Sequence, residues 1–478
     1  MTERHQNYIN GAFVDSSGGD WIPVHNPATD ATLSEVPDTP ASIVGDAVDA
    51  AKSAQRAWEA TPAIERAGHL RTIAAKLREN ASEIARTIVE EQGKVMGLAE
   101  VEVNFTADYM DYTAEWARRL EGEILPSDNR GENIFMFRQA IGVVGGILPW
   151  NFPFFLIARK LAPALVTGNT IVIKPSEETP NNAAMFARLM DETDLPKGVA
   201  NFVYGRGATT GSALCDNPDV GLLTFTGSVG TGSRIMAAAA KNITKVNLEL
   251  GGKAPAIVMA DANMDKAVSA IVASRVINSG QVCNCAERVY VEAGAEDEFV
   301  TKLTKAMAAS TFGDPMKDQS VDYGPMINKA GLDKVAGLVE RAKAAGGLIT
   351  TGGEAADLGA GNYYKPTVIT GVAQDSEIMQ NEVFGPVLPI NVVGSLDEAI
   401  ERANDSEYGL TSSIYTNDIG NAMRAANELK FGETYINRNN FEAMQGYHAG
   451  VRKSGIGGAD GKHGLLEFTQ THMVYLQT

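Results

Sequence analysis

Cysteine, histidine and basic residues are all scarce in this chain, and each shortage excludes a class of protein. The 478 residues include only three cysteines, Cys215, Cys283 and Cys285, which form no disulfide framework and indicate a reducing compartment. Cys283 and Cys285 lie too close together to suggest a metal site, and without a cluster of histidines we expect no metal. Basic residues number 41 against 59 acidic ones, and the net charge of −18 argues against nucleic acid or an anionic membrane as a main partner.

Long apolar runs are missing as well. The longest nearly apolar stretch, residues 147–158, is interrupted by Asn151 and is too short to cross a bilayer. The first seven residues have no apolar core, so they do not resemble a secretory signal. We therefore expect a cytoplasmic protein that is not attached to a membrane.

The abundant residues indicate an α/β protein of two or three domains, with 44% apolar residues, 21% charged residues and 48 glycines. Near the start, Asn10-Gly11 predicts a hairpin turn, and residues 41–119 show helical spacing. From residue 141 onward, short runs rich in Val, Ile and Leu alternate with helix-length segments, and a second such series begins at residue 288. Because continuous apolar strands alternating with helices form parallel sheets covered on both faces, we predict two doubly wound, Rossmann-like units.

Residues 279–288 place a thiol on a tight loop between a helix and a strand. An apolar stripe at helical spacing precedes the loop, with Asp261 as the expected N-cap, and Gly280 can adopt the left-handed conformation that ends such a helix. Cys283 follows in a polar stretch. An isolated cysteine is most often a small buried hydrophobe. On this loop, however, the thiol would be held rigidly, within reach of a substrate and beside free backbone N–H donors.

Two polar residues follow predicted strands, at the edge where ligands bind in parallel α/β sheets. Asn151 lies between two prolines, and its amide could donate to a developing oxyanion, although an asparagine that caps a turn is an equally good interpretation. Glu249 is flanked by leucines, and partial burial would raise its pKa toward the range of a general base. A solvated glutamate at a strand end is the simpler alternative. For each of these two residues, the local sequence alone is compatible with both the catalytic and the structural interpretation.

Lys174 and Glu177 also lie at a predicted strand end and could hold the hydroxyls of a ribose. A carboxylate at the 2′-hydroxyl would repel a 2′-phosphate, which favours NAD over NADP. Residues 205–211 are glycine-rich and open a helical segment, as at phosphate-binding helix N-termini. Their spacing departs from the usual dinucleotide fingerprint, so this signal is weak by itself.

Together these motifs resemble those of the NAD(P)-dependent aldehyde dehydrogenase superfamily, and the resemblance extends over essentially the whole chain. Any one motif could occur by chance, but six of them in the order of the family make the resemblance specific. The six are Pro149-Trp150-Asn151-Phe152-Pro153, Lys174-Pro175-Ser176-Glu177, Phe225-Thr226-Gly227-Ser228, Leu248-Glu249-Leu250-Gly251-Gly252-Lys253, Gly280-Gln281-Val282-Cys283 and Asn381-Glu382-Val383-Phe384-Gly385-Pro386.

The resemblance implies an enzyme that oxidises an aldehyde to a carboxylic acid with NAD. Cys283 occupies the position of the family's nucleophile, whereas Cys285 does not and receives no catalytic role. The thiolate would add to the carbonyl, Asn151 and the Cys283 backbone N–H would hold the oxyanion, and hydride transfer would leave a thioester. Glu249 would then activate the water that releases the acid. Lys160 occupies a family position beside the substrate channel, and we include it among the catalytic residues.

The resemblance also implies how the cofactor is bound. The expected contacts are Lys174 and Glu177 on the adenosine ribose, Gly207 and Ser228 at the adenosine and phosphate end, Glu382 on the nicotinamide ribose, Phe384 near the nicotinamide, and Trp150 as a further contact.

Within the family, the local sequence is most similar to that of enzymes that oxidise lactaldehyde and glycolaldehyde, so we expect a small hydroxyaldehyde as substrate. Arg159 replaces an aromatic residue common in the family and would lie on the helix leading away from Asn151. Glu442 and His448 would face Arg159 across the channel. We expect these three side chains to line the entrance and bind the hydroxyl beside the aldehyde, with Asn284 as a further substrate contact.

The family's architecture implies three parts and a homo-oligomer, which we expect to be a tetramer. Alternation in residues 133–138 and in the C-terminal segment is typical of edge strands that pair with another subunit. The expected parts are an NAD-binding domain of residues 1–118 and 140–248, a catalytic domain of residues 249–457, and a bridging element of residues 119–139 and 458–478.

Three functions compete at this point. The leading one is oxidation of a small hydroxyaldehyde, and a near rival is a semialdehyde dehydrogenase in which Arg159 binds a distal carboxylate. A catalytically silent scaffold is the third, but a scaffold needs neither Cys283 nor Glu249. The sequence departs from the family pattern at Ala459, where the family has an acidic residue that relays protons away from the general base. Asp460 or a water would take that role for Glu249.

Overall fold

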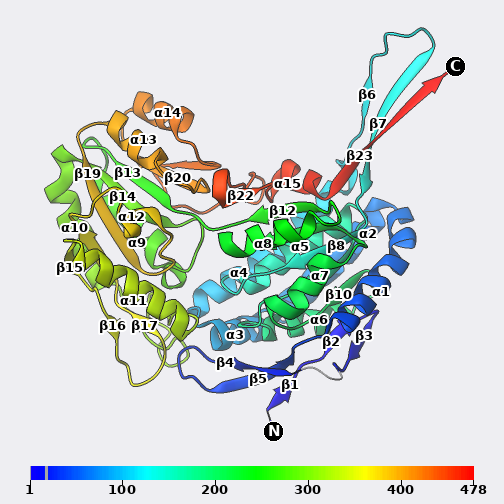
Figure 1. Cartoon of the computed structure of the whole chain (residues 1–478), viewed down its shortest axis with the longest axis horizontal. Helices are drawn as coiled ribbons and strands as arrows, with labels where there is room; N and C mark the ends of the chain where they lie inside the picture. The colour runs from blue at the N-terminus through cyan, green and yellow to red at the C-terminus, as the bar shows by residue number, and fades with distance from the viewer. Residues whose placement is uncertain (1, 17–19) are drawn as a thin grey trace.

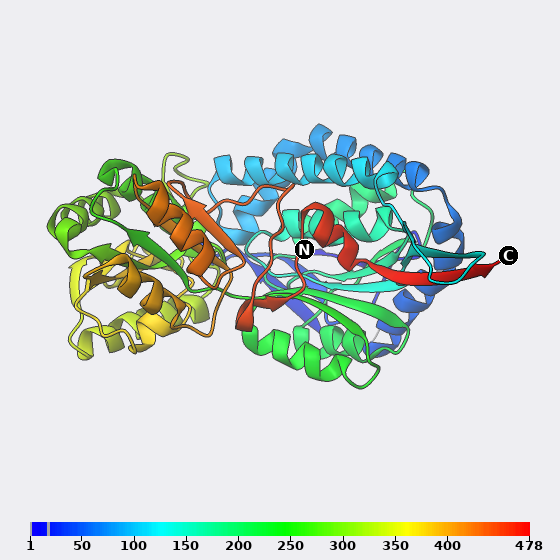
Figure 2. The same cartoon turned by 90° about the horizontal axis from the view of Figure 1, so that it is seen from above.

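Two large sheets organise the chain, and a third, small sheet extends away from them (Figure 1). The computed structural model describes residues 2–16 and 20–478. Seen from above, the two large sheets lie in separate lobes, and the C-terminal strand projects from the far end of one lobe (Figure 2). Within the described ranges, no helix is both long and apolar enough to cross a membrane.

The first lobe contains an eight-stranded sheet with the order β22-β12-β11-β8-β9-β10-β2-β3. Its central strands β8 to β12 run parallel, and their side chains alternate between two apolar clusters, one on each face. Helices α2 to α6 cover one face, and α1, α7 and α8 cover the other, so the predicted doubly wound unit is confirmed. The bounds are β2 Asn7–Ile9, β3 Ala12–Val14, β8 Val143–Ile147, β9 Thr170–Lys174, β10 Ala200–Phe202, β11 Val220–Thr226, β12 Lys245–Glu249, β22 Gly455–Ile456, α1 Ala41–Ala60, α2 Ala63–Glu79, α3 Ala81–Gln92, α4 Met96–Ala114, α5 Pro153–Val166, α6 Asn181–Asp191, α7 Ser212–Asp216, α8 Val229–Ala239 and α15 Gly461–Glu467.

The second lobe contains a seven-stranded sheet with the order β15-β18-β19-β14-β13-β20-β21, parallel except for β15. One face packs against α9 and α10, and the other packs against α11 to α14. The second doubly wound unit is therefore also confirmed. The bounds are β13 Ala254–Val258, β14 Ala286–Glu292, β15 Leu348–Thr351, β18 Thr367–Thr370, β19 Val387–Val393, β20 Thr411–Tyr415, β21 Glu433–Ile436, α9 Met264–Val276, α10 Glu296–Ala309, α11 Lys329–Ala344, α12 Glu377–Gln380, α13 Leu396–Asn404 and α14 Ile419–Glu428.

The small sheet that extends from the first lobe has the strand order β23-β7-β6 and joins two segments that are far apart in the sequence. Strand β23 runs antiparallel to β7 along its whole length, and β6 pairs with the other edge of β7. Ile124 and Tyr475 are among its exposed apolar side chains. The predicted strand at residues 133–138 is confirmed, whereas pairing with another subunit stays a prediction. The remaining elements are β1 Glu3–Arg4, β4 Trp21–His25, β5 Thr32–Pro37, β6 Glu123–Leu125, β7 Glu132–Ala140, β16 Ala355–Ala356, β17 Tyr363–Tyr364, β23 Thr469–Gln477, η1 Glu115–Arg118, η2 Gly207–Gly211, η3 Ile277–Gly280, η4 Ala293–Ala295 and η5 Arg452–Ser454.

Two local predictions have different outcomes. Asn10 and Gly11 connect β2 to β3 with φ angles of 53° and 69°, which confirms the predicted hairpin turn. The expected N-cap of α9 is wrong, because Asn263 accepts from the Lys266 backbone N–H instead of Asp261. The Asp261 carboxylate accepts from the Thr416 hydroxyl at 2.8 Å, so a tertiary partner from the end of β20 occupies it.

Candidate active site

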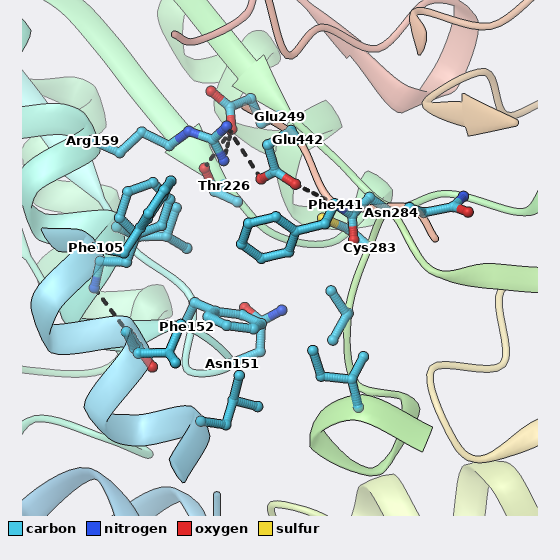
Figure 3. A pocket seen from close by; sticks show the side chains of 18 residues that line it. Phe105, Asn151, Phe152, Arg159, Thr226, Glu249, Cys283, Asn284, Phe441 and Glu442 are labelled. Atoms are coloured by element: carbon cyan, nitrogen blue, oxygen red, sulfur yellow. Dashed lines mark hydrogen bonds and ion pairs between the residues drawn. The ribbon is translucent and has the colours of Figure 1, made fainter. Parts of the chain in front are cut away.

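A pocket lies where the two lobes meet, and the ends of β8, β12 and η3 bring its polar residues together (Figure 3). Asn151 follows β8, Glu249 ends β12, and Cys283 follows η3. All three line the pocket, as do Arg159, Asn284 and Glu442. These six residues come from separate sequence motifs, and the structure places them around one cavity.

The loop that carries Cys283 is held in an unusual backbone conformation. Asn278, Ser279 and Gly280 have consecutive positive φ angles of 49°, 60° and 73°. A Cβ on Gly280 would lie 2.4 Å from the Gly385 carbonyl, so only glycine fits. The Arg275 guanidinium donates to the carbonyls of Gly280 and Ala286, which anchors both ends of the loop. The predicted left-handed Gly280 is confirmed, and the thiol is presented from a rigid support.

The two neighbouring cysteines lie in different environments. Cys283 is half-buried and lines the pocket. Cys285 is fully buried, and its thiol donates to the Val282 carbonyl at 2.9 Å. Burial raises the pKa of Cys285 to about 12, which leaves it as an inert thiol at neutral pH. Of these two cysteines, only Cys283 is therefore suited to act as a nucleophile.

A buried carboxylate that the sequence analysis missed ties this loop to its surroundings. Glu287 forms ion pairs of 2.8 Å with both Lys253 and Arg275, and it accepts from the backbone N–H groups of Val383 and Phe384. Burial raises the pKa of Glu287, but the two cations lower it further, to about 2. The sequence signal was a pair of charged residues, Glu287 and Arg288, at the start of an otherwise mostly apolar strand.

Asn151 is fixed by its own backbone and side chain. Its carbonyl accepts from Lys94 Nζ at 2.9 Å, and Lys94 is paired with buried Glu102. Its Nδ2 donates to the Gln281 carbonyl at 3.0 Å, so the amide keeps a second N–H for the pocket. Within the described chain, the backbone N–H of Cys283 has no hydrogen-bond acceptor. These two N–H groups could together hold an oxyanion beside the thiol.

Glu249 is 3% exposed and surrounded by donors. Lys160 Nζ lies 3.2 Å from one carboxylate oxygen, and the Arg159 guanidinium lies 3.7 Å from the other. Burial raises the pKa of Glu249, but Lys160 and then Arg159 lower it to about 2. The expectation of a raised pKa is therefore wrong, because the two cations outweigh desolvation. Neither the sequence motif nor the burial of Glu249 alone revealed these partners.

Arg159 is 4% exposed and lies deep in the pocket, so the prediction that it lines the entrance is wrong. Its guanidinium binds Asp460 through two nitrogens, with Nε donating to Oδ1 at 3.0 Å. It also lies 3.5 Å from a Glu442 oxygen, and Glu442 accepts from Asn284 Nδ2 at 2.5 Å. Figure 3 shows the guanidinium between the carboxylates of Glu249 and Glu442.

Apolar side chains, which the sequence analysis did not select, form most of the remaining wall. The rings of Phe105 and Phe155 pack 4.9 Å apart, and Phe441 packs 6.0 Å from Phe105. Leu98 and Val101 line the same side of the pocket. The pocket therefore combines an apolar wall with a compact polar cluster beside Cys283.

His448 is 2% exposed and, within the described residues, is not part of the pocket wall. It therefore does not line the entrance, contrary to the sequence-based expectation. Its Nδ1 lies 3.0 Å from Glu433 Oε1, so the imidazole contacts a carboxylate on β21.

A separate hollow lies on the first lobe, between η2 and α8, with Glu177 at its edge. Lys174 Nζ lies 2.8 Å from Glu177, and the Gly207 backbone N–H donates to the other carboxylate oxygen at 3.1 Å. Burial raises the pKa of Glu177, but Lys174 more than offsets it, so the net pKa is lowered. Ser228 caps α8 by accepting from the Thr231 backbone N–H. These four predicted cofactor residues come from elements around the hollow.

The other predicted cofactor residues lie on the loop after α12 and the loop after β8. Glu382 accepts from the Gly252 backbone N–H at 2.8 Å, and burial followed by Glu287 raises its pKa to about 7. Phe384 has a positive φ of 57°, and its ring packs edge-on against Trp150 at 5.6 Å. These residues and Asn151 place a carboxyl group and two rings near the pocket.

Comparison with known proteins agrees with this geometry. The family model described as "Aldehyde dehydrogenase family" matches residues 13–474. The chain is 62% identical over 99% of both chains to lactaldehyde dehydrogenase of Escherichia coli (strain K12), whose crystal structure matches with a TM-score of 0.99 over 100% of both chains. It is 40% identical, over 99% of both chains, to 3,6-anhydro-alpha-L-galactose dehydrogenase of Vibrio sp. (strain EJY3). Identity to the NADP(+) succinate-semialdehyde dehydrogenase of E. coli (strain K12) is 37%, over 98% of this chain and 96% of that one.

Proposed function

This chain belongs to the aldehyde dehydrogenase family, and from that premise we propose that it oxidises small 2-hydroxyaldehydes, such as lactaldehyde and glycolaldehyde, to carboxylic acids with NAD. The observation that carries the choice of substrate is the cluster of Arg159, Glu442 and Asn284 beside Cys283. The relative with 62% identity, named lactaldehyde dehydrogenase, supports the same substrate class.

The residues present fit a nicotinamide cofactor. The hollow beside Glu177 and the N-terminus of α8 would take the adenosine ribose and the phosphates, with Lys174, Gly207 and Ser228 as further contacts. Glu382, Phe384 and Trp150 would hold the nicotinamide end near Cys283. When bound, the cofactor supplies the acceptor for the hydride. We assign NAD over NADP because the Glu177 carboxylate would repel a 2′-phosphate.

In the first half-reaction, Cys283 acts on the aldehyde. Its sulfur adds to the carbonyl carbon, and the Asn151 amide and the Cys283 backbone N–H hold the oxyanion that forms. Loss of hydride from this adduct leaves a thioester on Cys283. The role of the protein in this step is to hold the oxyanion and to keep water out of the buried part of the pocket.

In the second half-reaction, Glu249 activates the water that hydrolyses the thioester. The carboxylate stays ionised at neutral pH because Lys160 and Arg159 lower its pKa. A water that lies between Glu249 and the thioester can therefore always find a proton acceptor. We assign Lys160 a positioning role, because its ammonium holds one Glu249 oxygen at 3.2 Å.

A hydroxyl next to the aldehyde would bind within the cluster of Arg159, Glu442 and Asn284. A site built to hydrogen-bond a hydroxyl penalises analogues that lack it, because its own polar groups are left desolvated and unpaired. The test is kcat/KM for glycolaldehyde, lactaldehyde, propanal and succinic semialdehyde. We expect both hydroxyaldehydes to exceed propanal by at least tenfold, equivalent to about 1.4 kcal/mol. Equal values for propanal and lactaldehyde would refute the role of the cluster.

The semialdehyde rival is less well supported by the charges in the pocket. Arg159 already contacts three carboxylates, those of Asp460, Glu249 and Glu442. Their negative charge exceeds that of the guanidinium and would repel a carboxylate carried by the substrate. Higher kcat/KM for succinic semialdehyde than for lactaldehyde would reverse this choice. The scaffold alternative loses its support because the chain retains the whole arrangement of Cys283 and its surroundings.

The assembly and location of the protein also belong to this proposal. We infer a cytoplasmic homotetramer in which the exposed small sheet of β6, β7 and β23 contacts another subunit. The proposed NAD-binding domain is residues 1–118 and 140–248, the catalytic domain is residues 249–457, and the bridging element is residues 119–139 and 458–478. Light scattering of the full chain would test the tetramer.

A further inference from the structure

The hydrogen-bond donors around the buried Glu287 carboxylate come from three separate segments of the chain. Glu287 lies near the start of β14 and is 1% exposed. Its Oε2 contacts Lys253 Nζ at 2.8 Å and accepts from the Val383 backbone N–H at 3.0 Å. Its Oε1 contacts the Arg275 guanidinium at 2.8 Å and accepts from the Phe384 backbone N–H at 3.1 Å. Each carboxylate oxygen therefore has one cation and one backbone donor.

The two backbone donors belong to the loop that carries Glu382 and Phe384. Phe384 has a φ of 57°, a conformation that residues with a side chain rarely adopt and that persists only when the surroundings hold it. Two successive N–H groups directed at one anion form an anion-binding nest, and the anion here is a side chain of the protein itself. The Glu287 carboxylate therefore holds this loop in its strained conformation.

The two cations connect the same carboxylate to the other segments of the active site. Arg275 also donates to the carbonyls at both ends of the loop that carries Cys283. Lys253 directly follows Gly252, whose backbone N–H donates to the Glu382 carboxylate at 2.8 Å. One buried carboxylate thus fixes the position of the Glu382 loop relative to the thiol.

We propose that Glu287 is a positioning residue for the cofactor, because it holds Glu382 and Phe384 where they can bind the nicotinamide end of NAD beside Cys283. This inference rests on the proposed function, which assigns those two side chains to the nicotinamide end. Glu287 acts through the loop, since both of its oxygens are already occupied by donors of the protein. The adenosine end is assigned to the hollow beside Glu177 on the first lobe, so Glu287 should leave its binding unchanged.

Hydrogen–deuterium exchange of the free, full-length protein tests the positioning without cofactor or substrate. In Glu287→Gln the side chain loses its charge, and an amide nitrogen replaces one of the two acceptor oxygens. We expect the amides of Val383 and Phe384 to exchange about tenfold faster than in the wild type, because local opening of the loop becomes easier. Exchange in β8 and β9 of the first lobe should be unchanged, whereas a general loss of stability would raise it there as well.

The binding of NAD and of AMP, measured by calorimetry, tests the consequence for the cofactor. AMP carries only the adenosine end, whereas NAD also has the nicotinamide end that the Glu382 loop would hold. If the loop keeps its binding conformation in about a tenth of the Glu287→Gln molecules, the Kd for NAD rises about tenfold. The Kd for AMP should stay at the wild-type value. A merely structural role of Glu287 would weaken both ligands alike.

Glu292→Gln is the matched control, because Glu292 lies on the same strand and also accepts from a backbone N–H, that of Ala260 at 2.7 Å. Its exchange pattern and both affinities should match those of the wild type. Glu287→Gln leaves Lys253 buried without its partner and could fail to fold for that reason. In that case the double variant Glu287→Gln with Lys253→Met decides by the same two measurements, since it removes the ion pair as a unit and keeps the net charge of the cluster.

Unchanged exchange of the two loop amides, an unchanged Kd for NAD, or equal losses of affinity for NAD and AMP would each overturn the proposal. A wild type that binds AMP as tightly as NAD would overturn it together with the assignment of the nicotinamide end. Failure of the proposed oxidation looks different. In that case the wild type would bind NAD more tightly than AMP and Glu287→Gln would still reduce that preference, whereas lactaldehyde and glycolaldehyde would not be oxidised.

Discussion

Replacing Lys160 by methionine tests whether one buried cation keeps Glu249 ionised. Lys160 Nζ lies 3.2 Å from Glu249 Oε1, and both side chains are buried. Burial raises the pKa of Glu249, and Lys160 followed by Arg159 brings it from the usual 4.5 to about 2. A depression of that size corresponds to about 3 kcal/mol in favour of the charged form. Methionine keeps most of the apolar stem of lysine and removes only the ammonium, so the change isolates the charge.

The sign of the pH dependence follows from the lowered pKa. A carboxyl group whose pKa is lower in the folded state stabilises the fold above its unfolded pKa, here about 4.5, and this contribution is lost as the pH falls toward 2. We therefore expect Lys160→Met to lower the free energy of unfolding at pH 7 by about 3 kcal/mol, the usual cost of removing one partner of a buried ion pair. The difference in unfolding free energy between the wild type and Lys160→Met should shrink as the pH falls below about 4.5. In that range Glu249 becomes protonated in the unfolded chain, so the wild type loses the stabilisation that came from its ionised form.

The kinetic assay is the rate of acid release in a single turnover, measured between pH 5 and 8. Glu249 stays ionised over this range in the wild type, so it should contribute no loss of rate on the acid side. In Lys160→Met, burial is still opposed by Arg159 and His448 but no longer by Lys160, so the pKa of Glu249 rises and an acid-side loss of rate should appear. Lys160→Arg, which keeps the charge, is the control and should retain a flat profile. Superimposable profiles for the wild type and Lys160→Met would refute this reasoning.

Three further predictions concern the same mechanism. Cys283→Ala should abolish aldehyde oxidation, whereas Cys285→Ala should retain most of it because that thiol is buried; equal losses in steady-state rate would contradict the assignment. Glu249→Gln should still produce one equivalent of NADH in a rapid burst and then stall at the thioester, and full steady-state turnover would remove Glu249 from the mechanism. The wild type should have a higher kcat/KM with NAD than with NADP. Glu177→Gln should lower this preference about tenfold, because it removes a repulsion worth about 1.4 kcal/mol. An unchanged ratio of the two kcat/KM values would show that Glu177 does not discriminate at the 2′-position.

Much of the fold could be predicted from the sequence because it depends on local patterns. Continuous apolar strands alternating with helices are stable only when both faces of a parallel sheet are covered, and both lobes have that arrangement. Gly280 was identified for the same local reason, since its conformation excludes other residues. The candidate nucleophile, base and oxyanion donor followed from motifs next to strand ends.

The electrostatic state of the site could not be predicted in this way. Glu249 was expected to have a raised pKa because its leucine neighbours indicate burial, but Lys160 and Arg159 come from a helix some ninety residues earlier. Glu287 on β14 likewise meets Lys253 and two backbone N–H groups only after two loops from elsewhere in the chain have packed against that strand. Burial is a local property that hydrophobic patterns reveal, whereas the identity of a charged partner depends on contacts distant in sequence.

The sequence alone therefore indicates the family of chemistry, through a candidate nucleophile, a candidate base and the periodicity of the strands. The tuning of those groups depends on tertiary contacts. The tertiary structure moved Arg159 from the expected entrance into a buried ion cluster with Asp460, and it placed His448 beside Glu433 and not among the described residues of the pocket wall. The physical reason is that Coulomb energies in a buried site depend steeply on separations of a few ångströms, and chain packing alone sets those separations.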